Sequence, residues 1–180
     1  MSETTIFDNL NKEVNGSDNL WVQEDGNTGL GVQFRLFSAA VVSRVRVRLS
    51  REGWNGFSGP TGHISGRIYG SHTNQFRDEN DYADGLVAQS ANDVTCEAIW
   101  SNEEGAIVEF IFGGVELAAG IYFLCLWSSD MIFEDPETQN QMGVIRWQGT
   151  DSAVSNVGYV TFWFSGAEGG ARWGSYREWD

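Results

Sequence analysis

Apolar and polar side chains alternate with a two-residue period along much of this chain. The clearest case is the segment 41–49, whose apolar positions are Val45, Val47 and Leu49 and whose arginines are Arg44, Arg46 and Arg48. Successive side chains of a β-strand point to opposite faces of its sheet, so this pattern predicts a strand with one buried and one exposed face. Further segments with strand character lie at 31–37, 64–69, 86–89, 94–100, 107–112, 121–127, 144–147 and 157–164.

These segments amount to about nine strands, and no long window keeps the period of a helix. The chain has 22 glycines and 2 prolines, and 13% of its residues are aromatic. Short strands joined by frequent turns are typical of two antiparallel sheets packed face to face. We therefore predict an all-β fold, an antiparallel two-sheet β-sandwich of jelly-roll-like form. A closed barrel is the alternative.

The length of 180 residues suits one domain. No internal repeat, low-complexity linker or break in composition divides the chain. We predict a polar N-terminal arm at 1–19, a β-sandwich domain at 20–165 and an aromatic C-terminal tail at 166–180.

The net charge of −14 restricts the partners of this protein. A surface dominated by carboxylates repels nucleic-acid phosphates and anionic lipid headgroups, so we expect neither nucleic-acid nor membrane binding. The apolar segment 121–127 is much shorter than a bilayer span. The first residues are polar and acidic, so we expect no secretory signal and synthesis of a soluble protein in the cytoplasm.

Few residues suggest catalysis. His63 and His72 flank one predicted strand, and we interpret both as exposed loop residues. No nucleophile-elbow, P-loop or zinc-protease motif is present, and the many carboxylates make accidental glycosidase-like pairs unavoidable. We therefore predict that the protein is not an enzyme and has no catalytic residues. Cys96 and Cys125 lie in apolar segments, which favours buried free thiols over a disulfide.

Two acidic loops offer oxygen ligands of the kind that calcium prefers. One contains Asp78, Glu79, Asp81 and Asp84, and the other contains Glu134, Asp135 and Glu137. Neither has the D-x-D-x-D-G order of a dedicated calcium loop. We predict no metal site and no cofactor, with bound calcium as the alternative.

The order of several segments resembles a known β-sandwich module. These segments are ISGRIYG at 64–70, GLVAQS at 85–90, VEFIF at 108–112 and VELAAGIYFL at 115–124. They are similar to the choice-of-anchor-type module of bacterial surface proteins and phage structural proteins, and the similarity covers residues 6–165. The resemblance implies a non-catalytic adhesive, carbohydrate-facing or scaffold domain. Because we expect neither a signal peptide nor a C-terminal anchor, it favours a virion component over a surface protein.

Arginines and aromatic residues are the candidates for binding a partner. The candidates are Arg44, Arg46, Arg48, Trp173, Tyr176 and Trp179. The arginines would form a basic stripe on an acidic protein, either paired with cross-strand carboxylates or docked on the acidic surface of a neighbouring copy. The aromatic residues of the tail belong to types that dominate many interfaces. They would either contact a partner or pack back on the domain.

Tryptophan can also stack on sugar rings. The candidates for carbohydrate binding are Trp147, Trp163 and Trp173. Trp100 and Trp127 lie within or at the end of apolar segments, so we expect both in the core.

Together these patterns favour a non-catalytic virion structural protein, such as a capsid cement or decoration protein or a tail component. It would dock on other virion proteins or on copies of itself, and we expect it in the virion after synthesis in the host cytoplasm. The alternative is a carbohydrate-binding or adhesive module of an extracellular protein that contacts a surface glycan.

Overall fold

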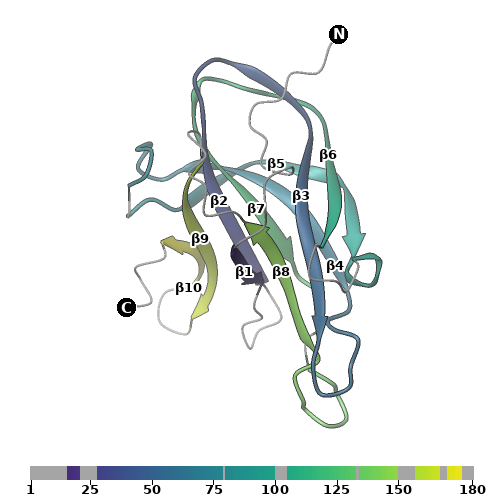
Figure 1. The fold of residues 1–180 in the computed structure, drawn as a ribbon. Coiled ribbons are helices and arrows are strands. Elements are labelled where there is room, and N and C mark those ends of the chain that lie inside the picture. The colour runs from purple at the N-terminus through teal and green to yellow at the C-terminus, as the bar shows by residue number, and fades with distance from the viewer. Residues whose placement is uncertain are drawn as a thin grey trace.

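The computed structural model describes residues 16–20, 28–78, 80–99, 105–132, 134–149, 157–166 and 170–175, with side chains for 29–78, 80–99, 105–132 and 134–147. Most of these residues lie in β-strands, and the helical structure among them is one short 3-10 turn, Cys96–Ala98. The strands form two antiparallel sheets packed as a β-sandwich (Figure 1), which confirms the predicted fold class. Within the described residues, no helix is long and apolar enough to cross a lipid bilayer.

Each sheet is built from strands that are distant in the sequence. Sheet A contains, in spatial order, β1 (Gly16–Leu20), β8 (Gly143–Gly149), β3 (Ala40–Gly53) and β6 (Ala106–Leu117). Sheet B contains, in spatial order, β10 (Gly170–Ser175), β9 (Val157–Gly166), β2 (Thr28–Leu36), β7 (Gly120–Ser128), β4 (His63–Ser71) and β5 (Ala83–Thr95).

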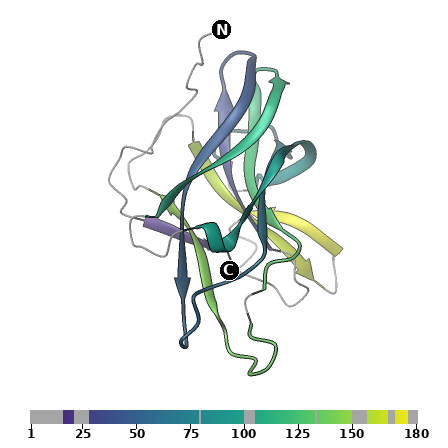
Figure 2. The same cartoon turned by 90° about the vertical axis from the view of Figure 1, so that its right-hand side faces the viewer.

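This strand order is that of a jelly roll. Sheet A runs β1-β8-β3-β6, and the matching part of sheet B runs β2-β7-β4-β5. The chain changes sheet at most connections, so that consecutive strands face each other across the core, as in paired Greek keys (Figure 2). The hairpin of β9 and β10 extends sheet B beyond β2.

All but one of the predicted strands are present, most with longer bounds than predicted. The exception is the strand predicted at 94–100, where β5 ends at Thr95 and the 3-10 turn follows. The sheets also extend past the predicted limits of the domain, because β1 begins inside the predicted arm and β10 lies in the predicted tail. Both strands are short and polar or glycine-rich, so they depend on pairing with β8 and β9 rather than on an apolar pattern of their own.

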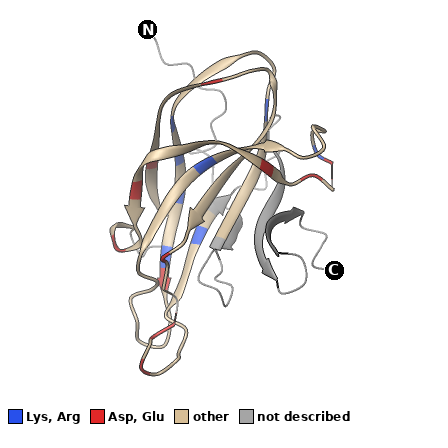
Figure 3. Cartoon of the chain, turned by 180° about the vertical axis from the view of Figure 1, so that it is seen from behind, with Lys and Arg blue, Asp and Glu red and all other residues tan. Residues whose placement is uncertain are grey.

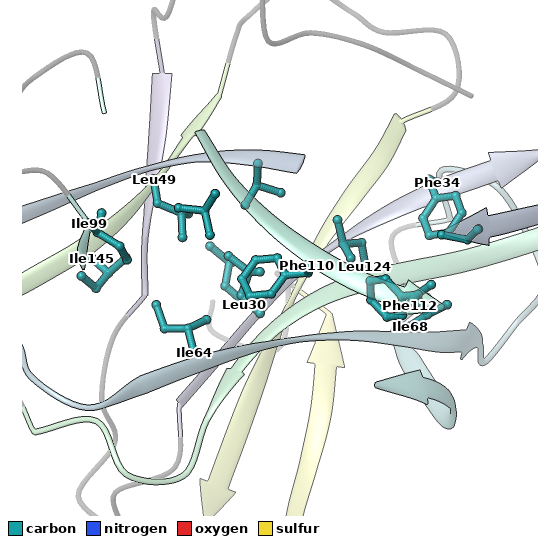
Figure 4. Packing of buried hydrophobic residues seen from close by; sticks show 14 of the residues in the cluster. Leu30, Phe34, Leu49, Ile64, Ile68, Ile99, Phe110, Phe112, Leu124 and Ile145 are labelled. Atoms are coloured by element: carbon teal, nitrogen blue, oxygen red, sulfur yellow. The ribbon is translucent and has the colours of Figure 1, made fainter. Parts of the chain in front are cut away.

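The main core fills the space between the sheets. Figure 4 shows side chains from both sheets meeting there; the completely buried ones include Leu49, Ile64, Ile68, Phe110, Leu126 and Ile145. Removing one such side chain from water contributes about 1.5–3 kcal/mol. The core therefore fixes the inward face of each strand and leaves the alternate residues on the outer faces.

A second, smaller cluster lies on the outer face of sheet B. It contains Tyr69, Ala83, Phe123, Cys125 and Trp127. The guanidinium carbon of Arg67 lies 4.7 Å from the ring centroid of Trp127, within the range of a cation–π interaction. Cα atoms of β10 come within 8 Å of Cα atoms of β5, so the two edges of this sheet approach each other.

Candidate interaction surface

The arginine stripe, Arg44, Arg46 and Arg48, lies on the outer face of sheet A. It alternates with the residues of β3 that pack in the core, of which Val47 and Leu49 are buried. The antiparallel register of β3 with β6 sets Ile111 opposite Arg44, Glu109 opposite Arg46, and Ile107 opposite Arg48. The register therefore identifies the cross-strand neighbour of each arginine, which the alternation of the sequence alone does not predict.

One carboxylate bridges two members of the stripe. Arg46 Nε donates to Glu109 Oε2 at 2.7 Å, and Arg44 Nη1 donates to the same oxygen at 3.3 Å. The hydrogen bond from Arg46, assisted by that from Arg44 and by both charges, holds the pKa of Glu109 below its ordinary value of 4.5 against the opposing effect of desolvation. Glu109 thus accepts hydrogen bonds from two guanidinium groups at this point of the sheet.

Exposed apolar side chains flank this charged group. Ile107 is 53% exposed and Ile111 is 45% exposed, on either side of Glu109 along β6. Farther along the same outer face, Val41 is 60% exposed and pairs with Glu116. We call the outer face of these two strands the β3–β6 face; it consists of Val41, Arg44, Arg46, Arg48, Ile107, Glu109, Ile111 and Glu116.

The other arginines whose side chains are described are engaged in contacts within the molecule. Arg51 donates to the carbonyl oxygens of Gly59 and Pro60, and Arg146 pairs with Glu52 at 2.6 Å. The remaining arginines of this set, Arg35, Arg67 and Arg77, lie over aromatic rings. The β3–β6 face is thus the place in the described structure where arginines gather on one strand.

No family model, curated protein or solved structure matches this chain. The resemblance to a choice-of-anchor-type module therefore stays a prediction.

The loops at one end of the sandwich carry the opposite charge. The loop 54–62, between β3 and β4, and the loop 129–142, between β7 and β8, project together (Figure 1). Thr61 and Ile132 exchange backbone hydrogen bonds of 3.1 and 3.0 Å, and Trp54 N donates to Met142 O at 3.0 Å. Acidic residues lie in this lower part of the molecule in Figure 3. In the loop 129–142 they are Asp130, Glu134, Asp135 and Glu137.

Several of the carboxylates considered as calcium ligands accept hydrogen bonds within the protein, and Glu79 lies outside the described residues. Asp81 is completely buried and accepts hydrogen bonds from Gln33, Ser71 and the backbone of Thr73. In the second acidic loop, Asp135 accepts backbone and hydroxyl hydrogen bonds from Thr138, which together lower its pKa. Among the described residues no three histidine, cysteine or acidic groups are placed to hold a metal ion.

The two histidines each contact an aspartate at the surface. His63 Nδ1 lies 2.7 Å from Asp130 Oδ2, and His63 N donates to Asp130 Oδ1 at 2.9 Å. His72 Nδ1 lies 3.4 Å from Asp84 Oδ2, and its ring stacks on Tyr82 with centroids 4.3 Å apart. The first pair links the start of β4 to the loop after β7, so its position indicates a role in holding the projecting loops.

Both cysteines are free and buried, as predicted. Cys96 packs in the main core and Cys125 in the second cluster. Burial raises the pKa of Cys96 to about 12 and raises that of Cys125 well above its ordinary value.

The tryptophans proposed to bind carbohydrate do not all belong to one sheet. Trp147 belongs to β8 of sheet A and packs against the main core. Trp163 and Trp173 belong to sheet B and are paired positions of β9 and β10. Trp127 is 8% exposed, in the second cluster. Trp100, Tyr176 and Trp179 lie outside the described residues.

Sequence reasoning missed two parts of the surface. Ile107 and Ile111 belong to a segment that was predicted only as a strand, and the alternation with Val108, Phe110 and Phe112 distinguishes them as exposed. The other part is Phe37, which is 70% exposed and lies 5.6 Å from the guanidinium carbon of Arg35. Arg35 lies in β2 and Phe37 comes two residues later, directly after the strand; this spacing was the available signal.

Proposed function

We propose that this protein is a non-catalytic virion structural protein, a capsid cement or decoration protein or a tail component, that docks on neighbouring subunits through the β3–β6 face. The observation that carries the proposal is the stripe of three arginines flanked by the exposed Ile107 and Ile111. Arginine is enriched in the centres of protein interfaces, where its planar head forms several hydrogen bonds while its stem buries apolar area.

The energetics of the shared carboxylate support docking on an acidic partner. An exposed ion pair such as Arg46 with Glu109 contributes little to the folding free energy, because water screens both charges. A carboxylate delivered by a partner would add a favourable charge interaction with the stripe, and the exposed isoleucines would lose contact with water at the same time. Both effects favour the bound state over the free protein.

The distribution of charge supports a specific orientation of docking. The net charge of −14 makes most approaches between two copies, or between this protein and another acidic subunit, repulsive. The β3–β6 face offers a local exception, so it would select one approach among many. The jelly roll itself is a fold that viral capsid proteins use repeatedly, which is consistent with a structural role but does not identify one.

The direct test is a search for the chain in purified particles. Virions from the source would be banded on a density gradient, and peptides of the chain would be identified by mass spectrometry. We expect the chain to band with particles in constant proportion to the major subunit. Recovery only from cell-surface or culture fractions, with none in particles, would contradict the proposal.

A binding assay then tests the β3–β6 face. Particles that lack the chain would be incubated with the wild-type protein, with Arg46→Glu and with the matched control Arg77→Glu. The control makes the same change of charge on the loop between β4 and β5. We expect Arg46→Glu to weaken binding about tenfold or more. Equal binding by both variants would exclude this face as the docking site on the other proteins of the particle.

The pairing of Trp163 with Trp173 favours one second candidate, a carbohydrate-binding module. Two tryptophans at paired positions of β9 and β10 would offer a platform for a sugar ring. This candidate predicts glycan affinity on an array that is lost in Trp173→Ala and kept in Trp54→Ala, a variant of the projecting loop. Absence of any glycan hit for the wild-type protein would exclude it.

A further inference from the structure

The molecule carries two exposed surfaces of opposite charge, and each of them also contains exposed isoleucine. On the β3–β6 face, arginines surround Ile107 and Ile111. On the projecting loop 129–142, exposed acidic residues follow Ile132, which is 52% exposed. We call residues 132–137 of that loop the acidic tip; its described residues are Ile132, Glu134, Asp135, Pro136 and Glu137.

The acidic tip is held in shape before any partner arrives. Ile132 is paired with Thr61 of the neighbouring loop, and Glu134 forms a β-bridge with Gln141. Asp135 uses its carboxylate to close the turn that contains Thr138. Glu134 and Glu137 are therefore presented from a backbone that is ordered by its own hydrogen bonds, which reduces the entropy lost on binding.

Charge decides which two surfaces of identical copies can meet. A contact between like surfaces of two copies would set arginine against arginine or one acidic tip against the other. Contact between the β3–β6 face of one copy and the acidic tip of the next pairs opposite charges and brings exposed isoleucines together. Only this contact between the β3–β6 face and the acidic tip avoids repulsion between like charges at both surfaces.

We propose that the partner of the β3–β6 face is a second copy of this chain, which inserts its acidic tip over the arginine stripe. The contact joins two different surfaces, so it either closes reciprocally in a two-fold dimer or repeats head to tail into a ring or a row of subunits. This inference rests on the proposed function, because it names the neighbouring subunit on which the arginine stripe docks.

Complementary charge reversal tests the contact. One variant, Arg44→Glu/Arg46→Glu, reverses the stripe, and the other, Glu134→Arg/Glu137→Arg, reverses the tip. Each variant alone would confront two surfaces of like charge. Mixed together, the acidic stripe of the first meets the basic tip of the second, and the unchanged tip of the first meets the unchanged stripe of the second. The mixture therefore restores both contacts.

The readout is molar mass in analytical ultracentrifugation, with far-UV circular dichroism to confirm that each variant is folded. We expect the wild-type protein to form species larger than a monomer at low ionic strength, and salt to dissociate them because it screens exposed charges. We expect each variant to be monomeric and the mixture to associate as the wild-type protein does. A wild-type protein that stays monomeric at all concentrations, or variants that associate without being mixed, would overturn the inference.

The stripe variant places two glutamates beside Glu109 and can lose stability for that reason. Ile107→Ser/Ile111→Ser therefore provides an independent variant that keeps every charge and removes the apolar part of the contact. We expect it to fold and to weaken association about tenfold or more; unchanged association would count against the contact. If the wild-type protein binds particles but never associates with itself, the proposed function stands and this inference fails.

Discussion

The side-chain oxygen of Asn92 accepts a hydrogen bond of 2.7 Å from the backbone N–H of Ile111. The amide nitrogen of the same side chain donates to the carbonyl oxygen of Glu109 at 2.9 Å. Asn92 lies in β5 of sheet B, whereas β6 is the edge strand of sheet A. One side chain thus satisfies two groups on an otherwise open strand edge and ties the two sheets together at that corner.

Replacing Asn92 with alanine should open this edge. We expect Asn92→Ala to lower the free energy of unfolding by about 1–3 kcal/mol, because a donor and an acceptor of β6 lose their partner. Urea denaturation measures the change. Asn80→Ala is the matched control, since Asn80 bonds only to Asp78 within its own turn. Equal loss of unfolding free energy in both variants would show that the hydrogen bonds of Asn92 to β6 do not stabilise the protein.

An exposed strand edge also favours pairing between molecules, so Asn92→Ala should aggregate sooner on heating than the wild-type protein.

Gly66 of β4 has no room for a side chain. A Cβ atom at this position would lie 2.8 Å from Phe110 Cγ in the main core. We therefore expect Gly66→Ala to cost about 1–3 kcal/mol through overpacking. Gly120→Ala is the control, because its Cβ would come no closer than 3.4 Å to the ring of Tyr122.

A compensating change separates overpacking from other effects at Gly66. Phe110→Leu alone should destabilise the protein by removing buried volume. The double variant Gly66→Ala/Phe110→Leu should lose less unfolding free energy than the sum of the losses in the two single variants. The reason is that the smaller side chain leaves space for the new methyl group. Strict additivity of the two losses in urea denaturation would contradict this explanation.

Much of the fold follows from the alternation of side chains, and the remainder depends on contacts that alternation does not encode. Segments such as 41–49 and 121–127 have enough apolar residues on one face to be identified locally. The sequences of β1 and β10 contain few such residues, and each becomes a strand by pairing with a neighbour that lies far along the chain or across a short turn. Cys96 ends β5 because the backbone turns there into a 3-10 helix, although the residues around it are apolar.

The candidate site shows the same division. The arginine stripe follows from the sequence, because one strand carries it. Glu109 as its shared partner follows only from the register of β3 with β6. Asp81 illustrates the opposite case: composition groups it with the carboxylates of an exposed loop, whereas the fold buries it against Gln33, a residue of β2 distant in the sequence.

Asp81 and Gln33 hold the loop between β4 and β5 on sheet B. Asp81 accepts hydrogen bonds from Gln33, Ser71 and Thr73, and Gln33 in turn accepts one from the backbone N–H of Arg77. In Asp81→Ala these three donors lose a buried acceptor, at a cost of about 1–3 kcal/mol for each group left unsatisfied. We expect the loop to open and trypsin to cleave after Arg77 at a much higher rate than in the wild-type protein. Asn80→Ala, in the same loop and exposed to solvent, should leave the rate nearly unchanged. Equal cleavage of both variants would contradict this role of Asp81.

The buried thiols should be chemically silent in the native protein. The raised pKa values of Cys96 and Cys125 keep both groups protonated at neutral pH, and the thiolate is the reactive form. We expect a thiol reagent to label neither group on the native protein in minutes and both after denaturation. Fast labelling of Cys125→Ser under native conditions would show that Cys96 is accessible, and fast labelling of Cys96→Ser would show the same for Cys125.

The ion pair of His63 with Asp130 should give the protein a pH dependence with a defined window. The hydrogen bond to Asp130, assisted by the charge of that carboxylate, raises the pKa of His63 above its ordinary value of 6.5. A group whose pKa is raised on folding contributes its full stability below the unfolded value and loses it as pH rises through the folded value. Desolvation opposes ionisation of Asp130, but the hydrogen bonds from His63 and Ser128 prevail and lower its pKa from 3.8. The contribution of this carboxylate is therefore complete above its unfolded pKa and disappears as pH falls through the folded value.

The pair should therefore stabilise the protein most between the ordinary pKa values of the two groups, 3.8 and 6.5. We expect the urea midpoint of the wild-type protein to fall between about pH 6 and about pH 8 by more than that of His63→Gln, which cannot gain the proton. Asp130→Asn should flatten the same part of the profile, because it removes the charge that favours the protonated imidazole. If His63→Gln and the wild-type protein lose stability in parallel over this range, the pair does not contribute, and the dependence originates at another titrating group.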